Sequence, residues 1–77
     1  MFPLVIATVD KVLFEGDVRF VTCPGREGEL TVLRNHIPFI TPLKKGTIRL
    51  KEDVEERTFD IERGLLEVTR RGTTILL

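Results

Sequence analysis

The side chains that could carry chemistry in this sequence are few and far apart. His36 is the only histidine and Cys23 the only cysteine among 77 residues. A zinc site needs several such ligands at short spacing, and a nucleophile needs a base beside it. Residues 25–29, GREGE, come closest to a phosphate-binding loop but lack its Gly-Lys-Ser/Thr ending and a following helix. We therefore expect no catalytic residue, metal or cofactor, and no enzyme activity.

The acidic side chains also argue against catalysis. They lie where turns are expected, and such carboxylates are normally solvated rather than buried as a general acid–base pair. Cys23 has no partner for a disulfide, so it is expected to be a small buried apolar residue in a cytoplasmic protein. The acidic groups in question are Glu15 with Asp17, Glu52 with Asp53, and Glu55 with Glu56.

Size and charge restrict the remaining functions. Residues 1–77 suffice for a single domain with a thin core, because a chain of this size buries only about 60–65 % of its unfolded surface. Twelve basic and twelve acidic residues cancel, whereas nucleic-acid binders normally carry a basic excess. No apolar run approaches the roughly 18 residues of a membrane span, and the first residues lack the features of a signal peptide. We expect no nucleic-acid partner and no direct membrane insertion.

The elements that must position these side chains are predicted to be β-strands. No stretch has apolar residues at helical spacing, whereas alternation of apolar and polar residues recurs, as in half-buried strands. Three stretches show it, with these residues sharing a face: Val18, Phe20 and Thr22 opposite Arg19; Ile48 and Leu50; and Phe59 and Ile61.

Turn signals separate these stretches at short intervals. Glycines that tolerate positive φ occur in residues 14–17, 23–26, 44–46 and 70–72, and Pro24-Gly25 suits the centre of a type II turn. The charged run at residues 50–57 is predicted to form a hairpin tip. Short strands with frequent turns indicate an antiparallel sandwich or barrel.

Residues 35–43, NHIPFITPL, are a poor strand. Pro38 and Pro42 share parity, so both missing N–H donors lie on one side, and the segment is predicted to be an edge strand or an irregular arch. If it is extended, Ile37, Phe39 and Leu43 share a face. Ile40 then points to the other face, toward solvent or a partner. The alternative is a local bend that buries all of these side chains.

Three segments together resemble a known family, the ε subunit of F-type ATP synthase. Residues 21–46, VTCPGREGELTVLRNHIPFITPLKKG, are similar to its V-x-x-P-G-x-x-G-E-x-G-V-L-x-G-H-x-P-x-x-T-x-L-x-x-G signature. KVLFEGDV at 11–18 and RGLLEVTRRGTTILL at 63–77 match its flanks in order and spacing. The chain departs from the family at residues 8–10, 31, 34–35 and 63. Asn35, where glycine is common, tolerates left-handed backbone geometry.

The resemblance implies an all-β fold, a flattened antiparallel β-sandwich of about ten short strands. It implies a non-catalytic rotor subunit of the central stalk that links the γ subunit to the membrane ring of c subunits and helps couple proton flow to ATP synthesis. The expected location is peripheral, on the cytoplasmic face of a bacterial plasma membrane. Most members continue into two C-terminal helices that restrain ATP hydrolysis. This chain ends at Leu77, so we expect no C-terminal helical hairpin, ATP binding or inhibition.

The resemblance also implies two interfaces. Residues 24–31 would face the c-ring, with Glu29 the best candidate for pairing with its basic groups. His36, Thr41 and Thr8 match family positions that lie against γ, and the edge-strand argument adds Ile37, Phe39 and Ile40. The c-ring candidates are Arg26, Glu27, Gly28, Glu29, Leu30 and Thr31.

Two other kinds of binding domain remain as alternatives. One is a small β-domain that recognises proteins, peptides or nucleic acid, although the lack of Trp and Tyr disfavours base stacking. The other is a carrier domain that displays a lysine at a hairpin tip, which Lys44-Lys45 before Gly46 approximates poorly.

Overall fold

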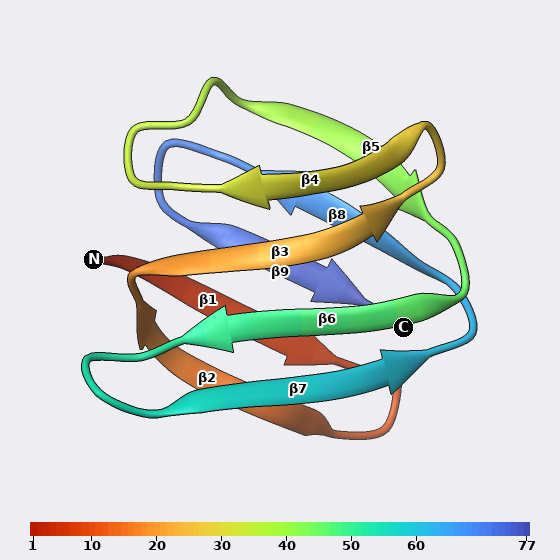
Figure 1. Cartoon of the computed structure of the whole chain (residues 1–77), viewed down its shortest axis with the longest axis horizontal. Helices are drawn as coiled ribbons and strands as arrows, with labels where there is room; N and C mark the ends of the chain where they lie inside the picture. Colours follow the sequence, from red (N-terminus) through yellow and green to blue (C-terminus); the bar gives the residue numbers. More distant parts are fainter.

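The computed structural model describes all 77 residues and contains nine β-strands and no helix (Figure 1). The all-β fold expected from the sequence is confirmed, with nine strands where about ten were expected. The strands are β1 (Phe2–Ala7), β2 (Val12–Val18), β3 (Phe20–Gly25), β4 (Gly28–Val32), β5 (Phe39–Leu43), β6 (Gly46–Lys51), β7 (Glu56–Ile61), β8 (Gly64–Val68) and β9 (Thr73–Leu76).

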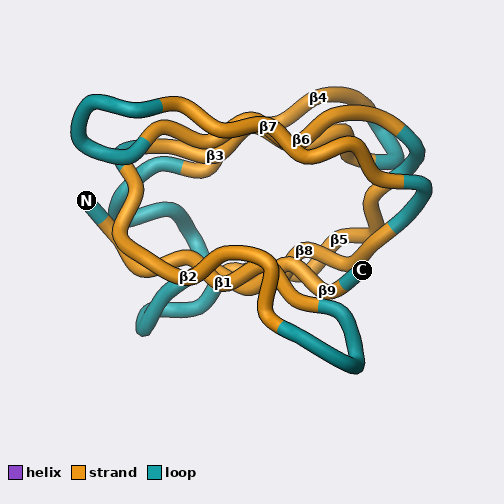
Figure 2. Tube along the Cα trace, turned by 90° about the horizontal axis from the view of Figure 1, so that it is seen from below, coloured by secondary structure: helices purple, strands orange, loops and turns teal.

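The strands form two facing layers, as Figure 2 shows. One layer has the order β4-β3-β6-β7 and the other the order β2-β1-β9-β8-β5. A single pair, Gly25 opposite Leu43, joins β3 to β5 and links the layers at one corner. Every pair is antiparallel except β1 with β9, which is parallel. This parallel pair is an exception to the antiparallel arrangement that was expected. The first and last strands are not joined by a hairpin, and the whole intervening chain forms the crossover connection that a parallel pair needs.

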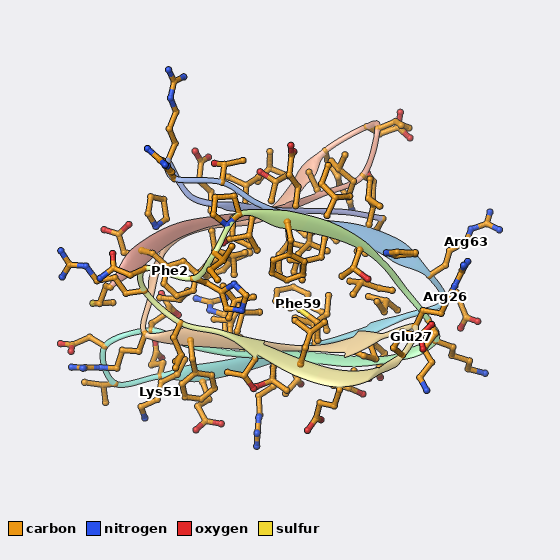
Figure 3. The ribbon with its side chains drawn as sticks, turned by 90° about the horizontal axis from the view of Figure 1, so that it is seen from above. Phe2, Arg26, Glu27, Lys51, Phe59 and Arg63 are labelled. Atoms are coloured by element: carbon orange, nitrogen blue, oxygen red, sulfur yellow. The ribbon has the colours of Figure 1, made fainter.

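The core fills the space between the layers. Alternate residues of the central strands point into it: Leu4 and Ile6 of β1 and Ile48 and Leu50 of β6 are fully buried. The sequence placed Ile48 and Leu50 on the core face, which is confirmed. Phe59 on β7 also lies between the layers (Figure 3), so its predicted orientation holds.

Phe20 and Thr22 were predicted to share a face with Val18, and this prediction was wrong. Strand β2 ends at Val18 and β3 begins at Phe20, so the chain turns at Arg19 and the alternation changes phase. Val21 and Cys23, both fully buried, therefore face the core in β3. Thr22 points the other way and is covered, with its hydroxyl 3.0 Å from that of Thr31 on β4.

Two of the predicted turns were also wrong. Residues 14–17 lie within β2, where Gly16 is paired with Leu4 of β1. Pro24-Gly25 lies within β3, and the turn is the next pair of residues, Arg26-Glu27. Pro24 can lie within the strand because its missing N–H points away from the ladder with β4. The direction follows from its carbonyl, which lies on the same side and accepts the N–H of Lys44, in the β5–β6 connection, at 2.9 Å.

The other turns lie where they were predicted, at residues 44–46, 70–72 and between β6 and β7. Strand β5 is the edge strand expected from its prolines. It pairs with β8 along its whole length and with β3 only at Leu43. Asn35, in the preceding loop, has a φ of 67°, the left-handed geometry that its side chain tolerates.

Candidate functional site

The connections between strands gather at two ends of the sandwich. Figure 1 shows the β1–β2, β3–β4, β5–β6 and β7–β8 turns at one end, called here the tip end. The β4–β5, β6–β7 and β8–β9 connections and the N-terminus lie at the other, called the cleft end. In Figure 3, Arg26, Glu27 and Arg63 mark the tip end, and Phe2 and Lys51 lie toward the cleft end.

The residues proposed to meet the c-ring lie at the tip end and along β4. Arg26 and Glu27 are the exposed turn of the β3–β4 hairpin. Glu29 and Thr31 are exposed on the outer face of β4, while Leu30 points inward and packs against the core. The structure contains only two ion pairs, Arg19–Asp53 and Arg57–Glu52, so the carboxylate of Glu29 has no ionic partner within the chain. A positively charged partner could reach it.

His36 and Ile37 lie in the β4–β5 loop and are exposed. The His36 ring contacts the Phe39 ring, with centroids 4.9 Å apart, and its Nδ1 lies 2.9 Å from the Ile37 carbonyl oxygen. Because a carbonyl only accepts, Nδ1 carries the proton in that contact. Ile37 is 77 % exposed and precedes β5, so the extended segment in which it would share a face with Phe39 does not reach it. Strand alternation begins at Phe39, after Pro38, and does not govern residue 37.

The remaining γ candidates divide between two faces of β5. Phe39 and Thr41 are half-buried and point inward with Leu43. Ile40 is 62 % exposed on the outer face, as the alternation predicted. The bend that would bury all of these side chains is therefore absent, and Ile40 is the γ candidate that β5 presents outward.

Thr8 lies apart from the other γ candidates. It follows β1, and strands β9 and β8 separate β1 from β5 in the layer. Its hydroxyl accepts the N–H groups of Asp10 and Lys11, each at 3.2 Å, and so stabilises the β1–β2 turn. The structure does not bring Thr8 together with His36.

The outer face of the β5 layer carries apolar residues that the sequence analysis did not single out. Pro42 of β5 lies opposite Leu65 of β8, which lies opposite Leu76 of β9. With Ile40, these residues form what we call the outer apolar row. Leu65 and Leu76 are 39 % and 48 % exposed. Period-two alternation in residues 64–68 and 73–76 was the available signal, but only the strand order shows that the two leucines are neighbours.

The only thiol of the chain lies in the core, and the side chains that could bind a metal do not cluster. Cys23 is fully buried, and burial raises the pKa of its thiol to about 12, which keeps it protonated and unreactive near neutral pH. No three His, Cys, Asp or Glu side chains lie close enough together to hold a metal ion. The structure contains no helix with the length and apolar composition that crossing a bilayer requires.

The chain is thus a two-layer β-sandwich with two exposed, chemically distinct surfaces, the tip with β4 and the outer face of the β5 layer. Comparison with known proteins gives its family: the beta-sandwich domain of the ATP synthase delta/epsilon chain matches residues 1–77. The chain belongs to this family, and the resemblance seen in its sequence is confirmed.

Three relatives illustrate the likeness, and all are ATP synthase epsilon chains. The chain is 42 % identical to the one from Caulobacter vibrioides over 67 residues, covering 87 % of this chain and 78 % of the relative. It is 42 % identical to the Dichelobacter nodosus chain, covering 97 % and 53 %, and 49 % identical to the Hyphomonas neptunium chain, covering 83 % and 48 %. The chain therefore spans about half the length of the latter two.

Solved structures share the fold. A chain in the Euglena gracilis mitochondrial ATP synthase, in a structure of OSCP, F1 and c-ring, superposes with a TM-score of 0.89 at 22 % identity. It covers 97 % of this chain and 49 % of that one. A chain in the central stalk and c-ring of the Tetrahymena thermophila enzyme gives 0.84 at 16 % identity, covering 97 % and 61 %.

Proposed function

We propose that the chain is a non-catalytic component of the central stalk of an F-type ATP synthase, holding the γ subunit to the c-ring. The observation that carries the proposal is the family match over all 77 residues. Such a component has no active site of its own, and it acts at the cytoplasmic face of a bacterial plasma membrane as a peripheral protein.

The fold suits the transmission of torque. A rotor element must be rigid and must bind two partners at once through separate surfaces. Rigidity comes from the strand ladders, which supply 36 of 45 backbone hydrogen bonds, and from a core shared by both layers. The two surfaces are separate because the tip residues and the outer apolar row lie on different elements, the β3–β4 hairpin and the β5 layer.

The chemistry of each surface suits a different partner. At the tip end, Glu29 offers an unpaired carboxylate to a basic polar loop of the c-ring. On the β5 layer, the outer apolar row offers exposed apolar side chains to γ, and contiguous exposed apolar surface is typical of protein interfaces. Phe39 and Thr41 would support this surface from within, since both point inward.

The test is binding to the γ subunit of the same organism. We expect the purified chain to form a stoichiometric complex with γ at micromolar concentration, measured by calorimetry and gel filtration. Replacing Leu65 and Leu76 by aspartate should weaken the complex at least about tenfold, because it places charge within an apolar contact. The matched control is Thr47→Asp with Thr58→Asp, two exposed positions on the opposite layer.

The outcomes separate this proposal from its alternative, a small β-domain that binds other proteins or peptides. No complex with γ at micromolar concentration would refute the rotor role and favour the alternative. Equal weakening by the control would show that the outer apolar row is not the γ surface. Circular dichroism of every variant must show the same strand content.

A further inference from the structure

The largest cavity of the molecule is an open cleft of about 630 Å³ at the cleft end. Three segments that are distant in the sequence form it: residues 1–3, the loop at 33–38, and residues 68–73 around the β8–β9 turn. Phe2 and Val68, both buried, form its floor. Its rim carries the exposed apolar side chains of Met1, Leu33 and Ile37.

The wall formed by the β8–β9 turn is rigid. Thr69 and Gly72 exchange backbone hydrogen bonds of 2.8 and 3.3 Å, which leaves Arg70 and Arg71 as a two-residue tip. The Thr69 hydroxyl also accepts the N–H groups of Arg71 and Gly72. A Cβ on Gly72 would lie 3.0 Å from the Pro3 carbonyl oxygen, so this turn packs directly on the N-terminal strand. The two arginines therefore project from a fixed position.

The opposite wall is also ordered by local contacts. The His36 N–H donates to the Leu33 carbonyl at 3.2 Å, which closes the loop on itself. The contact between the His36 and Phe39 rings holds the loop on β5. Arg34 lines the cleft from this side.

The cleft carries charge of one sign in a chain with none overall. Arg34, Arg70 and Arg71 line it, and none of its 15 lining residues is acidic. The only ion pairs in the structure involve Arg19 and Arg57, so these three guanidinium groups have no ionic partner. Arginine presents fixed pairs of donors that match the two oxygens of a carboxylate. The cleft is therefore chemically suited to an anionic ligand.

We propose that the cleft binds an acidic polypeptide segment that also carries an apolar side chain. Both parts of the cleft then find a complement: the guanidinium groups pair with carboxylates, and the apolar rim and floor cover a side chain. A small hydrated anion would leave Leu33, Ile37 and Met1 exposed to water. A flat anionic membrane would touch the rim and leave the floor empty.

The test uses the isolated chain and a synthetic probe, so its result does not depend on whether γ binds. The probe is a fluorescein-labelled acidic peptide of aspartate and glutamate with one leucine and one phenylalanine, followed by fluorescence anisotropy. We expect saturable binding that weakens as salt is raised. The double variant Arg34→Glu with Arg71→Glu should weaken it at least about tenfold, because attraction becomes repulsion. The single variant Ile37→Ser should weaken it less.

The matched control is Arg49→Glu with Arg63→Glu. It changes the net charge equally but alters exposed residues on the outer face of β6 and at the tip end. We expect the control to bind the peptide as the unmodified chain does. When the peptide is added to the unmodified chain, the backbone amide resonances of residues 33–37 and 69–72 should shift in NMR spectra.

Four results would overturn the inference. They are no saturable binding of the peptide, equal loss in the control variant, complete displacement of the peptide by inorganic phosphate at equal concentration, and binding to anionic phosphatidylglycerol vesicles in place of the peptide. The third result would indicate a small-anion site and the fourth a membrane surface.

Discussion

The tip end and the cleft end are both made of connections between strands, but they present different surfaces. At the tip end, the turns at 26–27, 44–45 and 62–63 are short and contain acidic as well as basic residues. At the cleft end, the longer loop at 33–38 stands off from the β8–β9 turn and leaves a hollow between them. Short hairpins therefore give a convex surface, and the one longer loop gives a concave one.

The two ends also differ in how their charged side chains are paired. Two carboxylates of the β6–β7 connection are paired, Asp53 with Arg19 and Glu52 with Arg57. Arg34, Arg70 and Arg71 take part in neither pair, so the arginines of the cleft have no ionic partner. A domain with no net charge thus presents a mixed surface at one end and a cationic hollow at the other.

The largest expected effects are losses of folding stability when a Cβ is added to a closely packed glycine at each end. Gly25→Ala should lower the free energy of unfolding by about 2–3 kcal/mol, because its Cβ would lie 2.7 Å from the Gly28 carbonyl oxygen and 2.8 Å from Leu30 Cδ2. Gly72→Ala should also lower it, by about 1–3 kcal/mol, because Gly72 has a φ of 158° that residues with a side chain rarely adopt, and the added Cβ would lie 3.0 Å from the Pro3 carbonyl oxygen. Urea unfolding of both variants measures the difference. A larger loss at Gly72 would mean that the cleft end is the more tightly constrained.

A smaller effect tests the partner of the tip end. Glu29→Lys should weaken binding to purified c-ring by about 1 kcal/mol at low salt, and by less at high salt, because an attraction between exposed charges becomes a repulsion that salt screens. The control is Glu55→Lys, the same change on the exposed β6–β7 connection at the cleft end. Microscale thermophoresis with detergent-solubilised c-ring measures both. Equal weakening in the two variants would remove Glu29 from the interface.

The smallest effect concerns the ion pair between Arg19 and Asp53 at the cleft end. Asp53→Asn removes the partner of Arg19, whose side chain is 53 % exposed, while that of Asp53 is 72 % exposed. Exposed pairs contribute little, so the free energy of unfolding should fall by less than about 0.5 kcal/mol. Binding of the acidic peptide should rise slightly, because Arg19 adds an unpaired charge at the cleft end. Chemical denaturation and anisotropy measure the two changes, and a loss above 1 kcal/mol would contradict this account.

Much of the fold could be predicted from local patterns. The alternation at Ile48, Leu50 and Ile61 marked core-facing positions because a strand with one buried face must alternate. The prolines marked β5 as an edge because a missing N–H interrupts a ladder. The same reasoning failed at Phe20 and Pro24, where the turn at Arg19 and the hydrogen bond from Lys44 depend on contacts that no local pattern contains.

The candidate surfaces were less predictable than the fold. The signature in residues 21–46 led to Glu29 and His36, the edge-strand argument led to Ile40, and the structure finds all three exposed. No local pattern indicated that Leu65 and Leu76 adjoin on one face, or that Arg34 and Arg71 share a cleft. Each pairing joins residues from separate strands or loops, and strand order alone sets their separation.

The all-β class, the edge character of β5 and the family follow from residue types and their spacing along the chain. The stacking of two layers, the parallel contact of β1 with β9, and the cationic cleft emerge only in the folded chain. These features bring together segments up to a whole chain length apart. Their formation depends on which strands pair and how their buried faces pack, and short stretches of sequence do not specify that pairing.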